Sequence, residues 1–509
     1  MTALAILAAL APLSGSAAGL AGARARLAGL AQAAGAAVAL GCSLALLSGI
    51  EGRAPLAGWD GFLYVDSLGG FFLMTVAGVT LLAALGSIGY IAAQEDDGEL
   101  SGFQVRLYFT FFGLFASLML AALETGNLGL LFVLIEASTL ASAALVGIEG
   151  RARSLEAAWK YVIISSLGVT IALAGTLFLF YSGSALHSVT NHGGSNLGLT
   201  WPYLLAHAQA LAPQSLRLAF LLAVVGYGTK VGLAPMHTWL PDAHAEAPSP
   251  ASAMLSAALL NTGMYAIIRF LAIAQARLGH TYPRAVLLSF GFASIVIGAL
   301  FMVRRGTAGG PGGRPPGIQS KRLFAYSSVE HMGIIAVALG FGGVLGLYGA
   351  LLQTLNHALA KAVLFLSSGD VSLRYRTREA GQVSGLLAAV PLTGGALLLA
   401  TFAVLGSPPF GLFLSELTIV RAGFAHGSPV FPLLLLALLG LAFVAFARTT
   451  TGMATGNPPA RLASPYRGRS AVAITAAPLV LGLAALLVLG LWIPAGLDTV
   501  LRHSIAVIG

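Results

Sequence analysis

Charge is scarce in this sequence, and lysine is the scarcest charged residue. Charged residues make up 9% of the 509 positions, and only four positions are lysine, whereas about 25% of a typical soluble domain is charged. The one cysteine, Cys42, excludes an internal disulfide and cannot hold an iron–sulfur cluster alone. Because its neighbours are apolar, we expect it to be a small buried side chain. These shortages exclude a soluble globular protein.

What is abundant is apolar sequence, which makes up 57% of the chain. Apolar stretches of about 20 residues, each long enough to cross a bilayer as a helix, recur from end to end. They are centred near residues 11, 39, 80, 113, 138, 170, 225, 261, 293, 333, 357, 396, 440 and 483. The predicted fold is therefore an all-α polytopic membrane protein with about 14 transmembrane helices.

Basic residues are distributed unequally between alternate loops. Sixteen fall on one side of such a protein: Arg24, Arg26, Arg151, Arg153, Arg304, Arg305, Arg314, Lys321, Arg322, Arg374, Arg376, Arg378, Arg448, Arg461, Arg467 and Arg469. The clearer ones on the other side are Arg53, Arg277, Arg284 and Arg502. Because positive charge stays inside, we expect an integral protein of a bacterial inner (plasma) membrane with both termini on the outer face. The net charge of +9 reflects this topology, and no nucleic-acid partner is expected.

Two apolar stretches are interrupted by glycine and proline. The first break, 226–235, includes Gly232 and Pro235, and the second, 406–411, includes Pro408 and Pro409. They fall in the seventh and twelfth predicted helices, and broken helices at matching places are typical of transporters built from repeats. We expect one membrane domain over 1–509, divided as follows: 1–100, helices 1–3; 101–273, first repeat (helices 4–8); 284–451, second, inverted repeat (helices 9–13); 470–495, last helix.

Two polar segments superficially resemble a phosphate-binding loop and a metal site, but their sequences support neither. The glycine-rich segment 309–317 lacks the Lys-Ser/Thr ending of a phosphate-binding loop and reads as an inner linker. Segment 235–250 has two histidines and two acids, but their spacing matches no standard metal-ligand pattern. We interpret it as a polar interfacial loop, with Ser249 or Ser252 capping the next helix. No metal site is expected.

Ionisable residues inside the apolar stretches are the candidate functional residues. A lysine at the bilayer centre is unfavourable by roughly 2.5–3.5 kcal/mol, so such residues are retained for a reason. Gln353, His357 and Lys361 have i, i+4, i+8 spacing and form a stripe on one helix face. The predicted proton-pathway residues are Glu136, Lys230, His331, His357, Lys361 and Glu416, with Glu330 and Gln353 as possible accessories.

The chemistry follows from burial and neighbouring charge. At about 4 Å and an effective dielectric near 20, a carboxylate and an ammonium attract by about 4 kcal/mol. Moving Glu136 toward or away from Lys230 would therefore control the lysine's proton, and histidines suit relay positions between such sites. Static pairing between helices remains the alternative for the charged residues Glu136, Lys230, Lys361 and Glu330. For His331 and His357 the alternative is that they simply satisfy buried hydrogen bonds. Lys160 and Arg269 lie near span ends, where they can snorkel to the interface.

Three segments resemble a known family. Lys230–His244 (KVGLAPMHTWLPDAH), followed by Ala247–Pro250 (APSP), is similar to the signature of the antiporter-like subunits of respiratory complex I (subunits L, M and N). The family also includes Mrp antiporter subunits and membrane subunits of group 4 energy-converting hydrogenases. Tyr326–Gly333 (YSSVEHMG) and Ser407–Glu416 (SPPFGLFLSE) look closest to the hydrogenase-4 component F branch. The resemblance covers about residues 60–450.

The resemblance implies fourteen helices and proton translocation driven by redox chemistry in partner subunits. It implies no cofactor in this chain; iron–sulfur centres, and nickel–iron or flavin, would belong to peripheral redox subunits that assemble with other membrane subunits. The family's key residues match Glu136, Lys230, His357, Lys361 and Glu416. A bridging Lys or His in helix eight is replaced here by Ser256 or Asn261.

Three functions remain open at this point. The first is a proton-translocating membrane subunit of a complex I-like or hydrogenase-like redox complex, which is electron transport coupled but has no catalytic site of its own. The second is a subunit of a cation/proton antiporter or an inorganic-carbon uptake complex without electron transfer. The third is a structural scaffold that has lost transport, which the departure at helix eight favours.

Overall fold

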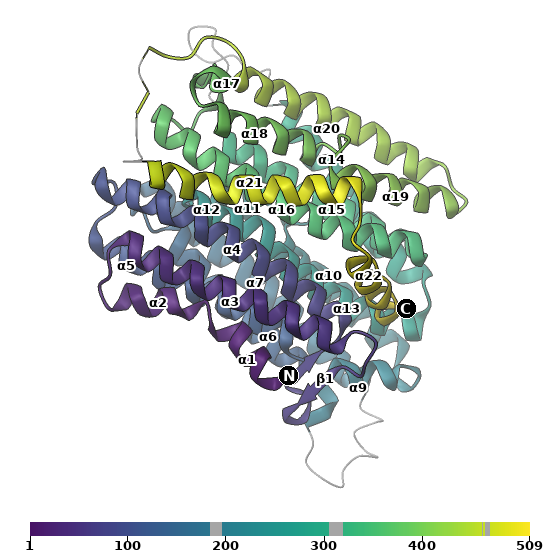
Figure 1. Cartoon of the computed structure of the whole chain (residues 1–509). Coiled ribbons are helices and arrows are strands. Elements are labelled where there is room, and N and C mark those ends of the chain that lie inside the picture. The colour runs from purple at the N-terminus through teal and green to yellow at the C-terminus, as the bar shows by residue number, and fades with distance from the viewer. Residues whose placement is uncertain (184–195, 305–318, 461, 464–468) are drawn as a thin grey trace.

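The computed structural model describes residues 1–183, 196–304, 319–460, 462–463 and 469–509. The predicted inner linker 309–317, part of the long outer loop, and Arg305, Arg314, Arg461 and Arg467 lie outside these residues. The described chain is nearly all helix, as predicted, and most long helices run roughly side by side (Figure 1).

The first half of the chain contains one small sheet among its helices. Strand β1 (Leu56–Gly58) pairs antiparallel with β2 (Leu63–Val65), and Ala57 lies opposite Tyr64. The α-helices of this half are α1 (Thr2–Leu10), α2 (Leu13–Leu20), α3 (Ala25–Ile50), α4 (Ser67–Asp96), α5 (Gly102–Glu124), α6 (Leu128–Val146), α7 (Ala152–Ser182), α9 (Trp201–Ala206), α10 (Pro213–Val231), α11 (Trp239–Glu246), α12 (Ser249–Met254) and α13 (Leu260–Leu278). A π-helical turn, Leu255–Leu259, joins α12 to α13.

The second half continues with longer helices and a short C-terminal one. They are α14 (Thr281–Arg304), α15 (Ser320–Phe341), α16 (Gly343–Tyr375), α17 (Leu386–Ala389), α18 (Pro391–Val404), α19 (Gly411–Ala425), α20 (Val430–Ala454), α21 (Arg469–Leu491) and α22 (Ala495–Ile508). Short 3-10 turns lie at Trp59–Gly61, Asn196–Leu199, Ala208–Ala210 and Ala380–Gln382. The last helix predicted from the sequence ended near residue 495. The additional helix α22 was not predicted, and it packs against α4 and α16.

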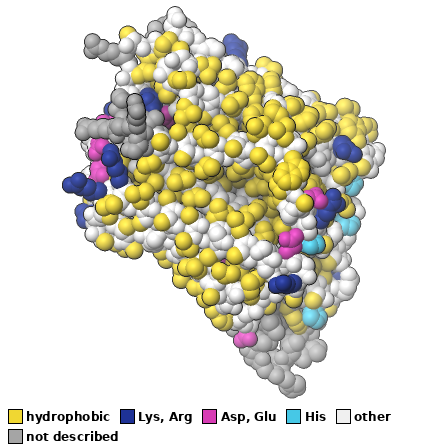
Figure 2. Space-filling view, in the orientation of Figure 1, with side chains coloured by type: hydrophobic (Ala, Val, Ile, Leu, Met, Phe, Trp, Pro, Cys, Tyr) yellow, Lys and Arg dark blue, Asp and Glu magenta, His cyan; other side chains and the backbone are white. Residues whose placement is uncertain are grey.

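Eleven described helices are long and apolar enough to cross a membrane, and α1 with α2, bent by 43°, would make a twelfth. Apolar side chains cover the middle of the face in Figure 2, whereas most Lys, Arg, Asp and Glu side chains lie toward its edges. This distribution is that of an integral membrane protein. The number of spans stays below the predicted 14 because α10, α18 and α19 are short or carry interior charge.

Two helix pairs approach each other backbone to backbone. A Cβ atom on Gly226 of α10 would lie 2.3 Å from the backbone nitrogen of Ala172 of α7. A Cβ on Gly333 of α15 would lie 2.7 Å from the carbonyl oxygen of Gly291 of α14. Only glycine fits at these contacts, and the sequence uses its glycines to bring α7 against α10 and α14 against α15.

Arg269 is buried, so it does not snorkel to the interface as we expected from its place near a span end. Its guanidinium makes a bidentate ion pair with Asp66, at 2.6 and 2.9 Å, and lies 3.9 Å from the ring centroid of Trp201. Asp66 also caps α4 by accepting from the Gly69 amide. The pair ties α13 to the start of α4.

Candidate functional site

Lys230 lies in the last turn of α10 and is completely buried. Its Nζ donates to Thr139 Oγ1 of α6 at 2.6 Å and to the Tyr161 hydroxyl of α7 at 2.7 Å. The helix ends one residue later because Gly232 adopts a left-handed conformation, with φ +80°, which favours glycine at a helix C-terminus. The predicted break therefore places the lysine at a helix end in the protein interior.

Two aromatic rings cover the same lysine. The Tyr161 ring centroid lies 4.7 Å from Lys230 Nζ and the Trp239 ring 6.0 Å from it, within the range of cation–π attraction. The two rings pack on each other, with centroids 4.6 Å apart. Tyr161 also shares a 2.7 Å hydrogen bond with Ser142. Hydroxyl groups and aromatic faces thus surround the ammonium group.

Glu136 lies on α6, three residues before Thr139, and is half-buried. One carboxylate oxygen accepts a hydrogen bond from Ser166 of α7, and the other has no partner among the described residues. No described ion pair joins Glu136 to Lys230. Thr139, about one helical turn from Glu136, accepts a hydrogen bond from the lysine instead. Glu136 is nevertheless within electrostatic reach of Lys230.

Lys361 is the centre of a second buried cluster. Its Nζ donates to the Phe324 carbonyl at 2.9 Å and to the Ser327 hydroxyl, both on α15. His357, one turn earlier on α16, has no hydrogen-bond partner for either ring nitrogen among the described residues. The rings of His357 and His331 lie 5.3 Å apart. The predicted i, i+4, i+8 stripe faces α15.

Gln353 connects this stripe to the second helix break. Its side-chain nitrogen lies 3.0 Å from His331 Nδ1, and its oxygen accepts a hydrogen bond from Ser415 of α19. The next residue, Glu416, is oriented toward the break between α18 and α19, where a Cβ on Gly406 would lie 2.0 Å from Glu416 Oε2. Pro408 and Pro409 lie between these two helices.

Glu330 is buried and contributes no described hydrogen bond through Oε1. A Cβ on Gly298 of α14 would lie 2.9 Å from its Cβ. It precedes His331 on α15 and is within electrostatic reach of both Lys361 and Glu416. The structure therefore brings this accessory residue into the second cluster.

The π-helical turn packs against α16, the helix that carries Lys361. Ser256, inside that turn, shares a 2.8 Å hydrogen bond with Ser328 of α15, the residue after the Ser327 that binds Lys361. Asn261 donates to the Ala257 carbonyl of its own helix, and its side-chain oxygen has no partner among the described residues. Ser256 and Asn261, the candidates for the position where the family often has a lysine or histidine, are both neutral. Single π-helical turns within α-helices are frequent at functional sites.

His244 is a buried titratable residue that is not among the proton-pathway residues predicted from the sequence. Segment 235–250, predicted to be an interfacial loop, instead contains the buried helix α11, because alanines and Trp239 give it an apolar surface. Nor does Ser249 or Ser252 cap α12, whose N-cap is Pro248. The His244 ring stacks on Phe365, one turn after Lys361, at 5.0 Å, and neither ring nitrogen has a described partner. In the sequence, His244 lies between Ala243 and Ala245, and these small apolar neighbours are the signal that could have indicated its burial.

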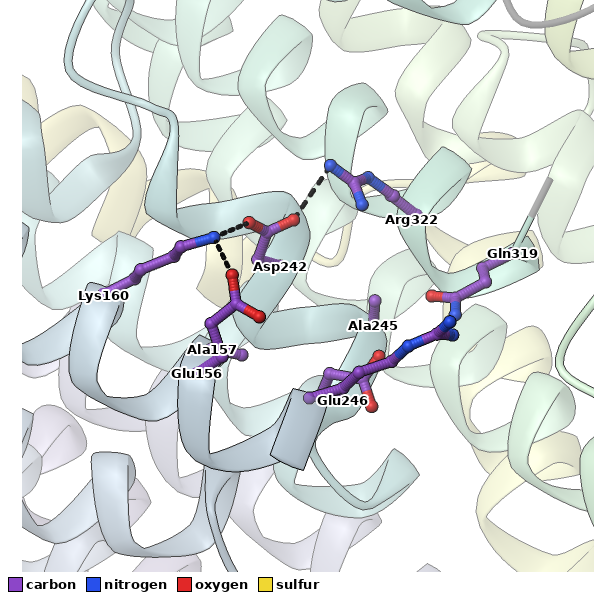
Figure 3. A pocket seen from close by; sticks show the side chains of 9 residues that line it. Glu156, Ala157, Lys160, Asp242, Ala245, Glu246, Gln319 and Arg322 are labelled. Atoms are coloured by element: carbon purple, nitrogen blue, oxygen red, sulfur yellow. Dashed lines mark hydrogen bonds and ion pairs between the residues drawn. The ribbon is translucent and has the colours of Figure 1, made fainter. Parts of the chain in front are cut away.

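A polar cavity of about 330 Å³ opens near the predicted inner ends of α7, α11 and α15. Figure 3 shows Asp242 between Lys160 and Arg322, at 3.8 and 2.9 Å, and the Lys160 ammonium also pairs with Glu156. Ala157 and Ala245 are buried at its wall. Because Tyr161 is one helical turn from Ala157, the cavity ends near the aromatic cover of Lys230.

These features define a class: an integral membrane protein with a buried array of titratable residues at two helix breaks. The family described as NADH:quinone oxidoreductase/Mrp antiporter, TM, matches residues 125–441. The chain belongs to this family, as its motifs indicated. Among the described residues, no group of three or more His, Cys, Asp or Glu side chains is placed to hold a metal ion.

Two curated relatives support the assignment. The Hydrogenase-4 component F homolog of Methylacidiphilum infernorum (isolate V4) is 39% identical over 365 residues, which cover 72% of this chain and 73% of that protein. The NADH-quinone oxidoreductase subunit N of Desulforudis audaxviator (strain MP104C) is 30% identical over 391 residues, covering 77% of this chain and 72% of that one. The predicted resemblance to both branches is confirmed.

The fold is also found in a solved structure. A chain of the membrane-bound sulfane sulfur reductase (MBS), an archaeal respiratory membrane complex, superposes with a TM-score of 0.82 over 99% of this chain and 96% of that one. At 22% identity this likeness concerns the fold alone.

Proposed function

We propose that this protein is the proton-translocating membrane subunit of a redox-driven complex. The observation that carries the proposal is the series of buried polar and titratable side chains between the two helix breaks. Buried ionisable residues are costly in a membrane and typical of proton relays. The names of the two relatives, a hydrogenase-4 component and a quinone oxidoreductase subunit, favour a redox complex.

In the proposed path, protons pass from the Lys230 cluster to the Lys361 cluster and on to Glu416. Glu136 acts on Lys230 through its charge, and Tyr161 and Thr139 accept the lysine's hydrogen bonds. His331 and Gln353 carry the path from the second cluster toward α19. A proton leaving Glu416 would depart at the second break.

We assign the step between the two lysines to His244, together with Ser256, which is bonded to Ser328. His244 is buried, has two free ring nitrogens among the described residues, and stacks on the residue one turn from Lys361. Histidine can both accept and donate a proton near neutral pH. It would supply the titratable group that helix eight lacks, and this argues against a scaffold that has lost transport.

We place the entrance for protons at the polar cavity around Asp242. Its open side lies among inner-face residues such as Arg153 and Arg322, and its far wall is one turn from Tyr161. Water in this cavity would connect the inner aqueous phase to Lys230. From the unequal distribution of basic residues, we propose that the basic face lies in the cytoplasm of a bacterial cell and that both termini lie outside.

The proposed topology has fourteen spans. In addition to the eleven single helices, α1 with α2, α10 with α11, and α18 with α19 would each make one span. Residues 101–273 and 284–451 would then form two inverted five-helix repeats, and the breaks would fall in the fourth helix of each. Opposed breaks near mid-membrane suit ion sites.

Glu136 also indicates where a partner subunit binds. It is half-exposed on a side of the molecule where Val133, Leu140, Ile163 and Leu167 are all exposed. An ionisable residue this close to a lipid-facing surface would be unfavourable, so we propose that another membrane subunit covers this face. Peripheral subunits would supply the iron–sulfur centres and the nickel–iron or flavin group.

The test is proton pumping by the assembled complex. Lys230→Ala and Glu136→Gln should each reduce pumping at least tenfold, while Arg502→Ala, which removes an exposed charge from α22, should leave it unchanged. Normal pumping by both pathway variants would rule the mechanism out. Nickel, flavin or neither in the purified complex then identifies the electron chemistry.

A further inference from the structure

A groove unrelated to the titratable array lies between α14 and α20, which pack side by side (Figure 1). It has a volume of about 470 Å³. Residues at three- and four-residue spacing on α14, including Thr281, Arg284, Leu288 and Phe292, line one wall, and Phe431 and Leu434 of α20 line the other. Such spacing places the α14 residues on one helix face.

The groove is apolar along its length and basic at one end. Leu288 and Leu434 line its middle. The rings of Phe292 and Phe431, 5.6 Å apart, close it on one side. Arg284 lies at the other end, near the start of α14. A molecule that fills this groove must therefore combine a long apolar part with a group that suits a cation.

The basic end is a cluster rather than a single arginine. Arg284 Nη1 lies 3.3 Å from Nδ1 of His426, in the loop between α19 and α20. Burial, together with the charges of Arg284 and His280, lowers the pKa of His426. Arg217 lies 5.9 Å from the ring centroid of Tyr282, next to Thr281. A guanidinium can only donate, so His426 Nδ1 accepts from Arg284 in this arrangement. Protonation of His426 would turn this contact into a repulsion unless an anion lay between the two groups.

No acidic side chain of the described residues pairs with this cluster. Segments 183–217, 279–284 and 426–429, which surround the cluster in sequence, contain no aspartate or glutamate. None of the ion pairs in the described part of the chain involves Arg284 or Arg217. By contrast, Arg502 on α22 pairs with Asp498. An anion that completes this cluster would therefore come from outside the described part of the chain.

We propose that this groove binds an anionic phospholipid, with one acyl chain between α14 and α20 and its phosphate on Arg284 and His426. Arginine binds phosphate with two parallel hydrogen bonds, and His426 would add a further donor when protonated. A helix of a partner subunit would fill the apolar part but leave the cluster uncompensated unless it brought an acid. The groove ends at the membrane surface, where a headgroup lies.

The test uses the purified complex and a phosphatidylglycerol with a photoreactive group at the end of one acyl chain. We expect crosslinked peptides from α14 and α20. Arg284→Ala and the groove-filling Ala285→Phe should each reduce their yield about fivefold, because one phosphate contact or the acyl-chain space is lost. Arg284→Lys, which keeps the charge, should retain most of it. Arg53→Ala, a basic residue after α3 that does not line the groove, should have no effect.

Several outcomes would overturn the proposal. If a phosphatidylcholine probe labels the groove as well as the phosphatidylglycerol probe does, the groove does not recognise the negative charge of the headgroup. Displacement by millimolar inorganic phosphate would indicate a free-anion site, and crosslinking of α14 to another protein subunit would indicate a subunit interface. Equal losses in Arg284→Ala and Arg53→Ala would point to surface charge alone. Thermal unfolding of each variant separates these results from misfolding.

Discussion

Neutral groups accept the hydrogen bonds of both interior lysines. Thr139 and the Tyr161 hydroxyl do so for Lys230, and the Phe324 carbonyl and Ser327 do so for Lys361. A direct ion pair would have to be broken each time a lysine gave up its proton, at a cost of several kcal/mol when buried. Neutral acceptors remove that step while still orienting the ammonium group.

Tyr161 is therefore the residue whose hydroxyl we expect to matter most. Tyr161→Phe keeps the ring over Lys230 but removes a hydrogen bond to a charged group, worth about 1.5–3 kcal/mol, and should slow proton transport about tenfold. Tyr227→Phe is the matched control, because Tyr227 is equally buried and its hydroxyl has no described partner. Pumping assays on the two variants would decide; equal effects would mean that the hydroxyl is not used.

Arg269 shows the opposite use of a buried charge. Arg269→Ala leaves Asp66 buried without a partner, and we expect it to reduce the free energy of unfolding by about 3–5 kcal/mol. The exposed pair of Arg502 with Asp498 should contribute much less, because solvent screens it. Denaturation in detergent measures both. Arg269→Ala combined with Asp66→Ala should be less destabilising than the sum of the single changes.

At the scale of the element, the second helix break positions Glu416. Gly406 has φ +61° and faces the Glu416 carboxylate, whereas Gly427 has φ +84° and nothing within 4 Å of its Cβ position. Both Gly→Ala changes should strain the backbone by about 1 kcal/mol, but only Gly406→Ala displaces Glu416. Transport should therefore fall in Gly406→Ala and persist in Gly427→Ala, while their melting temperatures shift alike. Transport lost in both would mean that backbone strain is responsible.

The elements differ in how readily sequence reveals them. Long apolar runs predicted the single helices, and glycine and proline marked both interruptions, since each acts through local backbone geometry. The π-helical turn at Leu255–Leu259 has no such local signal, because its residues all favour an ordinary helix. Burial of α11, and with it the position of His244, depends on α7, α12 and α15 packing around it. These features depend on contacts between segments that are distant in the sequence, so local sequence patterns could not predict them.

At the scale of the whole molecule, the proposed orientation can be checked with single cysteines. Cys42 is buried, so it should react little. Ala152→Cys, at the start of α7, and Gly496→Cys, in α22, are at exposed positions that we place on opposite sides of the membrane. A membrane-impermeant maleimide should label Gly496→Cys in intact cells and Ala152→Cys only in inside-out vesicles. The reverse pattern would place both termini in the cytoplasm.

The glycine contacts between α7 and α10, and between α14 and α15, have a mechanical consequence. Where two backbones touch, no side chain lies between them to be compressed or to change rotamer, so each pair behaves as one stiff rod. Lys230 is on one rod, and Ser327 and His331 are on the other. We therefore expect displacements during turnover between the rods and in segments outside them, such as α11, the π-helical turn, and the chain between α18 and α19.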